Sequence, residues 1–160
     1  MLLVQAVDRD GQPSFISIAG ANRLLSADDI SHIKEVIKSA PVLVCDKGIP
    51  LESCDFALKL GTELGSKTIF NPSPKLKTIE PSIYPNTYLM VLNADEGESL
   101  TGIPVTSAES AKNAILEIHN RGTKNVIITL GADGAVCSEK NISPQLNGEC
   151  CNIHVSILRK

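Results

Sequence analysis

The sequence predicts an α/β fold with a mainly parallel sheet. Short apolar runs alternate with amphipathic helical patterns along most of the 160 residues. The central runs are almost continuously apolar, which is typical of strands that are covered on both faces. The segments between them are long enough for helical crossovers, and such crossovers join parallel strands.

Composition and charge narrow the class of protein. Hydrophobic residues make up 42% of the chain and aromatic residues only 3%, so we expect one domain with an aliphatic core. The formal charge of −3 and the lack of a basic stripe argue against nucleic acid and anionic membranes as partners. No apolar run reaches the length of a membrane span, and the N-terminus lacks the pattern of a secretory signal. We expect a cytoplasmic location, with the nucleus as a second one.

The chain opens with a predicted β-hairpin. Leu2–Val7 and Ser14–Ala19 are short apolar runs, and the Asp-Gly pair between them is a hairpin signal. An isolated hairpin is only marginally stable in water, so we expect it to pair with other strands or with a second subunit. A turn over Ala19–Asn22 follows.

The next elements alternate between helix and strand. Apolar residues recur every three or four positions in the helical segments, while short β-branched runs mark the strands. The expected elements are a helix over Ala27–Ala40 capped by Ser26, a strand over Val42–Cys45, a helix from Pro50 to Gly65, and a strand over Lys67–Asn71. The run Asn71-Pro72-Ser73-Pro74 cannot continue a regular element.

The second half repeats this alternation. The expected elements are a strand over Thr87–Leu92, an acidic helix over Asn93–Leu100, a helix over Ala108–Arg121 capped by Ser107, and strands at Val126–Ile128 and Ala135–Cys137. The tail from 141 to 160 has no strong pattern, although His154–Leu158 is compatible with one more strand.

Cysteine and histidine patterns give no metal site. The count of five cysteines, with Cys45, Cys54 and Cys137 in apolar patterns, predicts buried thiols in a reducing compartment. The run from Cys150 to His154 lacks the paired spacing of a structural zinc site. His32 and His119 are expected at solvated or flanking positions of their helices.

The residues just after each strand are the candidates for a binding site, because ligands bind beyond the carboxyl ends of parallel strands. Asn93 and Glu96 lie three apart on one helix face, and a carboxylate there can hold Mg²⁺ through its water shell. The alternative is that the pair forms only a helix-capping box.

The turn from Thr129 to Gly134 is the second candidate. Its two glycines allow positive φ angles or a close approach to a ligand, and its N–H groups and the Thr129 hydroxyl suit a nucleotide. A plain turn between two strands is the alternative, since neither GxGxxG nor a Walker pattern is present.

Taken together, several segments resemble the ribokinase family of sugar kinases. They occur in family order from Met1 to about Lys140 and read GQPSFISIAGANRLLS, VLVCDKGIPLES, KTIFNPSP, VLNADEGESLTG and NVIITLGADGAV. The resemblance implies a three-layer α/β/α ribokinase-like fold that is truncated at both ends. Residues 1–140 would form a partial kinase domain with a lid hairpin at 1–19, and residues 141–160 a divergent tail.

The resemblance also implies an activity, which is the ATP-dependent phosphorylation of D-ribose on its 5-hydroxyl with Mg²⁺. Asn93 would face the nucleotide phosphates, and Glu96 would act on Mg²⁺ through water. The residues that would line the ATP site are Thr129, Leu130, Gly131, Ala132, Asp133 and Gly134. The lid hairpin would cover the sugar and pair with a second subunit, so a homodimer is implied.

The sequence departs from the family pattern in four features. It lacks a Gly-Gly-Lys-Gly-Ala-Asn-type sugar segment and the Gly-Ala-Gly-Asp segment whose Asp is the general base, so no catalytic residue is assigned. The family's K⁺ site is not found in this chain either. Gly48 stands where the family has a Glu that contacts ribose, and Asp46 and Lys47 are the nearest replacements.

These departures predict weak or no turnover by this chain alone. Two alternatives stay open. The chain could be a non-catalytic piece that associates with a full-length kinase through its hairpin, or it could belong to a kinase for adenosine, fructose or a pyridoxal-type vitamer.

Overall fold

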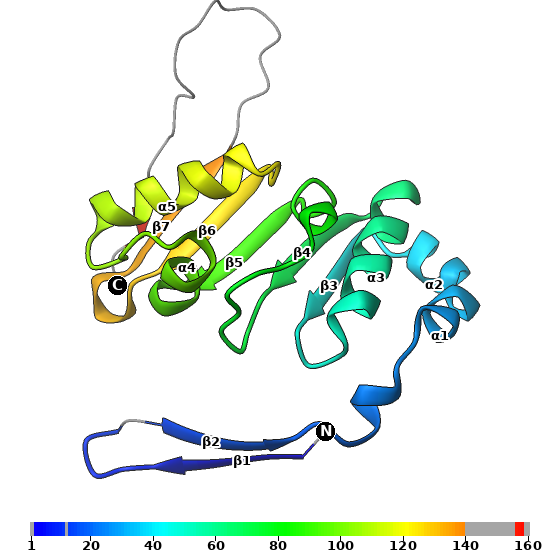
Figure 1. Cartoon of the computed structure of the whole chain (residues 1–160), viewed down its shortest axis with the longest axis horizontal. Coiled ribbons are helices and arrows are strands. Elements are labelled where there is room, and N and C mark those ends of the chain that lie inside the picture. The colour runs from blue at the N-terminus through cyan, green and yellow to red at the C-terminus, as the bar shows by residue number, and fades with distance from the viewer. Residues whose placement is uncertain (1, 12, 140–155, 159–160) are drawn as a thin grey trace, which may run out of the picture.

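The computed structural model describes residues 2–11, 13–139 and 156–158, which form two separate sheets (Figure 1). The first is an antiparallel hairpin of β1 (Leu2–Val7) and β2 (Pro13–Ile18). The second has six strands in the order β3-β4-β5-β6-β7-β8. Its strands are β3 (Val42–Asp46), β4 (Lys67–Asn71), β5 (Leu89–Asn93), β6 (Asn125–Thr129), β7 (Ala135–Glu139) and β8 (Ser156–Leu158).

The large sheet is parallel through its first four strands. The β3–β4, β4–β5 and β5–β6 pairs are parallel, whereas β7 and β8 continue the sheet in antiparallel fashion. The predicted α/β class with a mainly parallel sheet is therefore confirmed. The carboxyl ends of the parallel strands lie on the side of the molecule where the hairpin is found (Figure 1).

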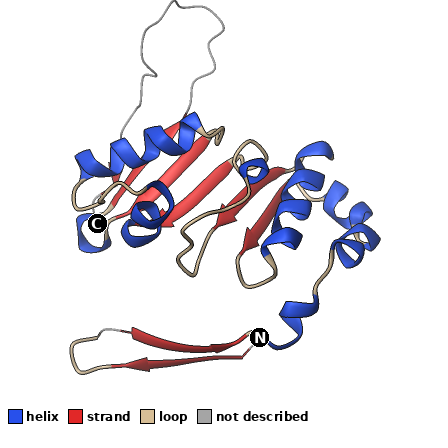
Figure 2. Ribbon diagram, viewed as in Figure 1, coloured by secondary structure: helices blue, strands red, loops and turns tan. Residues whose placement is uncertain are grey.

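A loop with a 3-10 turn joins β4 to β5, while helices precede β3 and connect β3 to β4 and β5 to β6, as Figure 2 shows. The helices are α1 (Ala27–His32), α2 (Lys34–Ser39), α3 (Leu51–Glu63), α4 (Ala94–Thr101) and α5 (Ala108–Asn120), with 3-10 turns at Gly20–Leu24, Pro81–Ile83 and Gly131–Asp133. Side-chain capping boxes begin α1, α4 and α5 at Ser26, Asn93 and Ser107. These caps satisfy N–H groups that have no partner within the helix.

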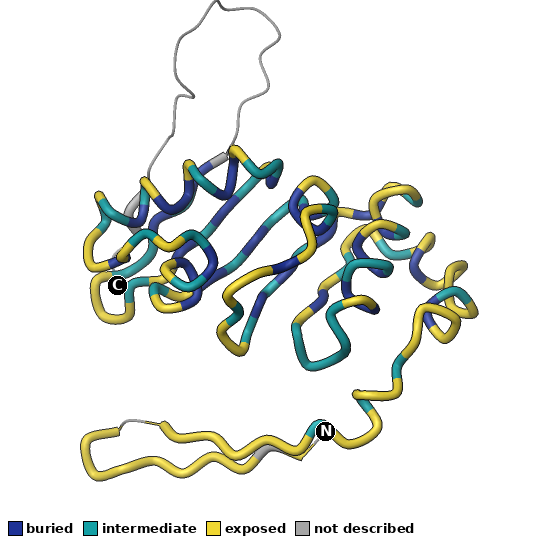
Figure 3. The backbone as a smooth tube through the Cα atoms, viewed as in Figure 1, coloured by how far each residue is buried: buried dark blue, intermediate teal, exposed yellow. Residues whose placement is uncertain are grey.

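Helices α3, α4 and α5 cover one face of the large sheet. Gly61 of α3 lies against Leu43 and Thr68, and Gly97 of α4 lies against Ile128. In α5, His119 places its Nε2 2.8 Å from the Ser138 hydroxyl of β7. The core between these layers is mostly aliphatic, as predicted. Its fully buried apolar strand residues are Phe70, Met90, Leu92, Val126, Ile128 and Val136 (Figure 3).

The opposite face of the sheet is also apolar, but no described helix packs on it. Because side chains alternate along a strand, Val44, Ile69, Val91, Ile127 and Cys137 point to this second face. Val44 is 66% exposed, and the other four are half-buried. Of the two helical layers in the three-layer prediction, the described residues supply one.

The single helix predicted over Ala27–Ala40 is wrong, because the chain breaks at Ile33. This residue has φ −103° and ψ 16°, which ends α1 and caps α2. Of the four apolar residues that suggested one helix, only Ile30 and Ile37 are buried, whereas Ile33 and Val36 are 50% and 65% exposed. Packing therefore does not impose a continuous helix here.

Several boundaries also differ from the prediction. β5 begins at Leu89 rather than at Thr87, because the Thr87 hydroxyl donates to the Ile83 carbonyl at 2.7 Å and belongs to the preceding turn. Pro50 is the N-cap of α3 rather than its first residue, and Asn93 is the N-cap of α4. The predicted turn after the hairpin is a 3-10 helix over Gly20–Leu24.

His119 is fully buried, so the prediction of a solvated or flanking position is wrong. Its Nδ1 lies 2.8 Å from the Thr123 carbonyl oxygen and its Nε2 reaches Ser138, which satisfies both ring nitrogens inside the core. In the tail, a strand was predicted over His154–Leu158, and Ser156–Leu158 of that segment is a strand paired with β7. Residues 140–155, 159 and 160, with Cys150, Cys151 and the two residues His154 and Val155 of the predicted strand, lie outside the described residues. No described helix has the length and apolar character that crossing a bilayer requires.

Candidate nucleotide site

The candidate residues meet at the carboxyl ends of β5 and β6. Asn93 ends β5 and Thr129 ends β6, and the two are direct neighbours in the strand register. Asp46 and Asn71 form the corresponding pair at the ends of β3 and β4. The strand order therefore brings all four polar residues to one edge of the sheet, where parallel sheets bind ligands.

Asn93 and Glu96 cap helix α4 through two reciprocal hydrogen bonds. The Glu96 N–H donates to Asn93 Oδ1 at 2.8 Å, and the Asn93 N–H donates to Glu96 Oε2 at 3.0 Å. The capping box considered from the sequence is thus present. It uses only one oxygen of each side chain, so the Asn93 amide group and the second Glu96 oxygen remain for a ligand.

Asn93 and Glu96 differ in how far they are exposed to solvent. Asn93 is exposed, whereas Glu96 is only 4% exposed. A carboxylate in this position fits Mg²⁺ held through water better than a bare ion bound by several protein ligands, because Mg²⁺ keeps much of its water shell. No cluster of three acidic, His or Cys ligands occurs among the described residues.

Gly97 fixes the position of α4, and sequence reasoning missed it. A Cβ on Gly97 would lie 3.2 Å from Ile128 Cδ1 and 3.5 Å from Val105 Cγ2. The helix therefore sits close to β6, and its N-terminus opens beside Thr129. A glycine inside a short acidic helix was the available signal, since glycine costs stability there unless close packing requires it.

The turn between β6 and β7 needs both of its glycines. Gly131 has φ +60° and Gly134 has φ +96°, values that other residues rarely adopt. Within the turn, Leu130 donates to the Gly134 carbonyl at 2.7 Å, and Asp133 and Gly134 donate to the carbonyls of Leu130 and Gly131. The backbone N–H groups of Gly131 and Ala132 have no acceptor among the described residues.

The other residues of the turn differ in exposure. Ala132 and Asp133 are exposed, and Leu130 is half-buried against the core. The Thr129 hydroxyl donates to the Leu92 carbonyl across a long 3.4 Å contact. The arrangement presents two amides and one hydroxyl beside the start of α4, where the partial positive charge of the helix also favours an anion. A chain of phosphates is the kind of ligand that these groups suit.

At the carboxyl ends of β3 and β4, the polar side chains bond to the protein's own backbone. Asp46 Oδ1 accepts a hydrogen bond from the Gly48 N–H at 2.7 Å, and a Cβ on Gly48 would lie 2.7 Å from the same oxygen. The Asp46 carboxylate thus occupies the space that a side chain at position 48 would need. At the end of β4, the Asn71 side-chain amide donates to the Val91 carbonyl of β5 at 2.7 Å.

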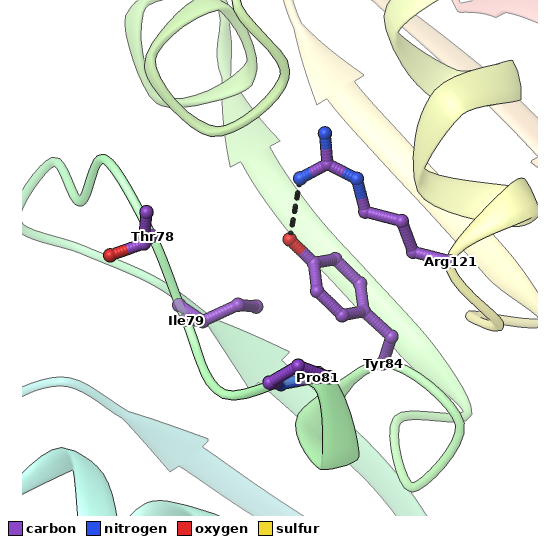
Figure 4. Close-up of a pocket in the computed structure, with 5 residues that line it drawn as sticks. All are labelled: Thr78, Ile79, Pro81, Tyr84 and Arg121. Atoms are coloured by element: carbon purple, nitrogen blue, oxygen red, sulfur yellow. Dashed lines mark hydrogen bonds between the residues drawn. The ribbon is translucent and has the colours of Figure 1, made fainter.

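A separate pocket of about 350 Å³ lies at the opposite end of the sheet (Figure 4). It is lined by Thr78, Ile79, Pro81, Tyr84 and Arg121. Arg121 Nη1 donates to the Tyr84 hydroxyl and to the Leu100 carbonyl, both at 2.9 Å, and its guanidinium pairs with Glu117. Tyr84 and Arg121 precede the amino ends of β5 and β6, so this pocket is not part of the candidate nucleotide site.

Comparison with known proteins identifies relatives over most of the chain. The model of the pfkB family carbohydrate kinases matches residues 2–149. The chain is 35% identical to the ribokinase of Mus musculus and 31% identical to the deoxyribokinase of Salmonella typhi, each over 130 residues and 81% of this chain. The matched stretch spans only 40% of the mouse protein and 42% of the Salmonella protein.

A solved structure agrees with these matches. The structure of Arabidopsis thaliana ribokinase complexed with ribose and ATP superposes with a TM-score of 0.70 at 25% identity. The superposition covers 84% of this chain and 44% of the Arabidopsis chain. The ribokinase-like α/β fold implied by the sequence is therefore confirmed, and the chain belongs to the pfkB family of carbohydrate kinases.

Proposed function

We propose that this chain carries the nucleotide-binding part of a kinase that transfers the γ-phosphoryl group of ATP to the 5-hydroxyl of D-ribose. Mg²⁺ is the metal of this reaction, and ribose 5-phosphate is the product. Family membership and the ribokinase and deoxyribokinase relatives support a pentose as the acceptor. The chain spans less than half of those relatives, so the proposal concerns the activity of the complete enzyme.

The observation that carries the proposal is the neighbouring placement of Asn93 and Thr129 at the start of α4. Phosphoryl transfer depends mainly on positioning and on stabilisation of charge. The Asn93 amide would bind phosphate oxygens, and Glu96 would hold Mg²⁺ through water. The Gly131 and Ala132 amides and the Thr129 hydroxyl would line the nucleotide, together with Leu130, Asp133 and Gly134. Bound Mg²⁺ would neutralise charge on the phosphates.

The acceptor side of the reaction needs residues beyond this site. Gly48 has no side chain with which to contact a sugar hydroxyl, and Asp46 occupies the space in front of it. No residue of the chain is assigned as the general base. We therefore expect the 160-residue chain to bind nucleotide and to phosphorylate ribose slowly or not at all.

A second role is favoured by the hairpin. Leu2, Val4, Ile16 and Ile18 share one of its faces in the register of β1 and β2, and all four are 50–68% exposed. An apolar face of this kind is typical of an association surface. We propose that it pairs with a second subunit, either another copy of this chain or a full-length kinase of the family.

Two measurements test these proposals. Release of ADP is followed with D-ribose, 2-deoxyribose, fructose and adenosine as acceptors, and fast turnover by the chain alone would contradict the expected lack of a base. Light scattering after size exclusion, with and without a full-length ribokinase, tests the hairpin. The expected result is a dimer or mixed complex that the Ile16→Asp variant disrupts, and a strict monomer under both conditions would rule out the second role.

A further inference from the structure

The pocket near the amino ends of β5 and β6 is a feature that the proposed nucleotide site does not explain. It has a volume of about 350 Å³ and is lined by Thr78, Ile79, Pro81, Tyr84 and Arg121 (Figure 4). Ligand sites in proteins commonly measure about 300–1,000 Å³, so this pocket is at the small end of that range. Its size therefore suits a small organic molecule.

The walls of the pocket are mostly apolar. Ile79 and Tyr84 are only 8% and 4% exposed, so they are its inner residues, whereas Thr78 and Pro81 are exposed at its rim. In Figure 4 the Tyr84 ring lies between Ile79 and the Arg121 side chain. The apolar part of a ligand would gain free energy by packing on these walls.

Two hydroxyl groups of the lining are able to donate to a ligand. The Tyr84 hydroxyl oxygen accepts a hydrogen bond from Arg121 Nη1 at 2.9 Å, but its own O–H has no acceptor among the described residues. The Thr78 hydroxyl makes no hydrogen bond to any residue in the described part of the chain. A buried Tyr hydroxyl usually finds a partner for its hydrogen, so Tyr84 favours an acceptor inside the pocket.

Arg121 supplies a further donor and a fixed positive charge. Its Nε and Nη2 lie 2.9 and 2.8 Å from Glu117 Oε1, and its Nη1 donates to the Tyr84 hydroxyl and the Leu100 carbonyl. These contacts use the Nε hydrogen, both Nη1 hydrogens and one Nη2 hydrogen, so the other Nη2 N–H has no acceptor among the described residues. They also hold the guanidinium in place, which reduces the entropy that a ligand contact would cost.

The chemistry of the lining selects the class of ligand. Tyr84, Thr78 and Arg121 all present donors, and no acidic residue lines the pocket in the described structure. A carboxylate accepts such donors in charge-assisted hydrogen bonds, which are stronger than neutral ones. A doubly charged phosphate fits less well, because Arg121 is the one cation of the described lining and already pairs with Glu117.

We propose that this pocket binds a small monocarboxylate. The carboxylate contacts the Arg121 guanidinium and the Tyr84 hydroxyl, and the apolar part of the molecule packs on Ile79 and Pro81. The pocket is separate from the carboxyl ends of the strands, so the proposal does not rest on nucleotide binding or on phosphoryl transfer.

Calorimetric titration of the 160-residue chain with benzoate tests the proposal. Benzamide, which has the same shape without the charge, and inorganic phosphate are titrated in parallel. We expect saturable binding of benzoate, and affinities for the other two compounds that are lower by at least about tenfold.

The two tyrosines of the chain provide a matched pair of variants. Tyr84→Phe keeps the ring and removes the O–H, and should weaken benzoate binding by about tenfold. Tyr88→Phe removes the same group from a half-buried residue beside Lys67 that does not line the pocket, and should leave the affinity unchanged. Unfolding in urea checks that both variants are folded.

NMR spectra of isoleucine methyl groups locate the bound molecule. The Ile79 signal, assigned with an Ile79→Val variant, should shift on addition of benzoate, whereas the signal of Ile33, which is 50% exposed at the α1–α2 break, should stay in place. The shift should persist when ATP and Mg²⁺ are added, because the nucleotide site is elsewhere.

Four outcomes would overturn the proposal. The first is no detectable binding of millimolar benzoate by the folded chain. The second is equal affinity of the Tyr84→Phe variant and the unchanged chain for benzoate. The third is binding of benzamide or inorganic phosphate as tight as that of benzoate. The fourth is displacement of benzoate by ATP and Mg²⁺, which would assign its binding to the nucleotide site.

Discussion

Asn93 and Glu96 hold each other by reciprocal hydrogen bonds of 2.8 and 3.0 Å at the start of α4. The same pair is the proposed contact with phosphate and, through water, with Mg²⁺. One pair of residues therefore has both a structural and a functional role, and the two roles have to be separated by experiment.

Replacement of Asn93 by Ala tests this separation. Loss of an N-cap costs about 1 kcal/mol of unfolding free energy, and loss of the phosphate contact lowers nucleotide affinity as well. Ser26→Ala is the matched control, because Ser26 caps α1 with the same reciprocal geometry at the β3 edge of the sheet. Urea unfolding and nucleotide titration should show similar stability losses for both variants, but weaker binding only for Asn93→Ala. Equal binding by the two variants would assign Asn93 a structural role alone.

Gly131→Ala tests the β6–β7 turn. The substitution forces a side chain into a φ of +60°, which costs about 1–2 kcal/mol and distorts the amides that face the ligand. Gly65→Ala introduces similar strain at φ +87° after α3, and no heavy atom lies near either added Cβ. We expect comparable loss of thermal stability, with reduced nucleotide affinity for the Gly131 variant only. A nucleotide affinity that Gly131→Ala leaves intact would argue against the turn as part of the site.

Gly97→Ala tests the contact that positions α4. A better helix former gains up to about 1 kcal/mol, but the added Cβ would lie 3.2 Å from Ile128 Cδ1, and overpacking costs about 1–3 kcal/mol. We expect net destabilisation. Removal of the crowding methyl by Ile128→Val should reverse the sign of the Gly97→Ala effect in a double-mutant cycle. Additive effects would show that the two residues do not compete for space.

The buried thiols predict a loss of stability in alkaline solution. Burial raises the pKa of Cys45 to about 11, and burial with the neighbouring Cys45 and Asp46 raises the pKa of Cys54 to about 12. In the unfolded chain a thiol has a pKa of about 8.5, so above this pH the unfolded chain releases protons that the folded chain keeps. The stabilising contribution is complete below that pH and falls as pH rises through 11 and 12.

Urea unfolding at a series of alkaline pH values measures this effect. The Cys45→Ala, Cys54→Ala double variant is the control for lysines and tyrosines that titrate in the same range. Its stability should depend less on pH than that of the unchanged chain. Parallel pH profiles would contradict the assignment to the two thiols.

The sequence was sufficient to predict elements whose local signals agree with their packing. Asn93 and Ser107 are residue types that favour the N-cap position, so α5 begins at Ala108 as predicted and α4 begins at Ala94, one residue after the predicted start. The sequence also predicted candidate residues just after each strand, but the register that joins Asn93 to Thr129 depends on strand order, which the sequence did not provide.

The errors occur where tertiary contacts decide the structure. The spacing of Ile30, Ile33, Val36 and Ile37 indicates one helix, but only two of these residues find a core to pack on. The burial of His119 depends on Ser138, 19 residues away in the chain, and no local pattern reports that contact. The close approach of Gly97 to Ile128 is likewise a contact between distant segments.

Isothermal titration of the 160-residue chain with ATP and Mg²⁺ tests the central claim most directly. We expect saturable binding at one site per chain, weaker without Mg²⁺ and weaker for Asn93→Ala than for Ser26→Ala. Absence of detectable binding at millimolar nucleotide, with the chain folded, would contradict a nucleotide site at the carboxyl ends of β5 and β6.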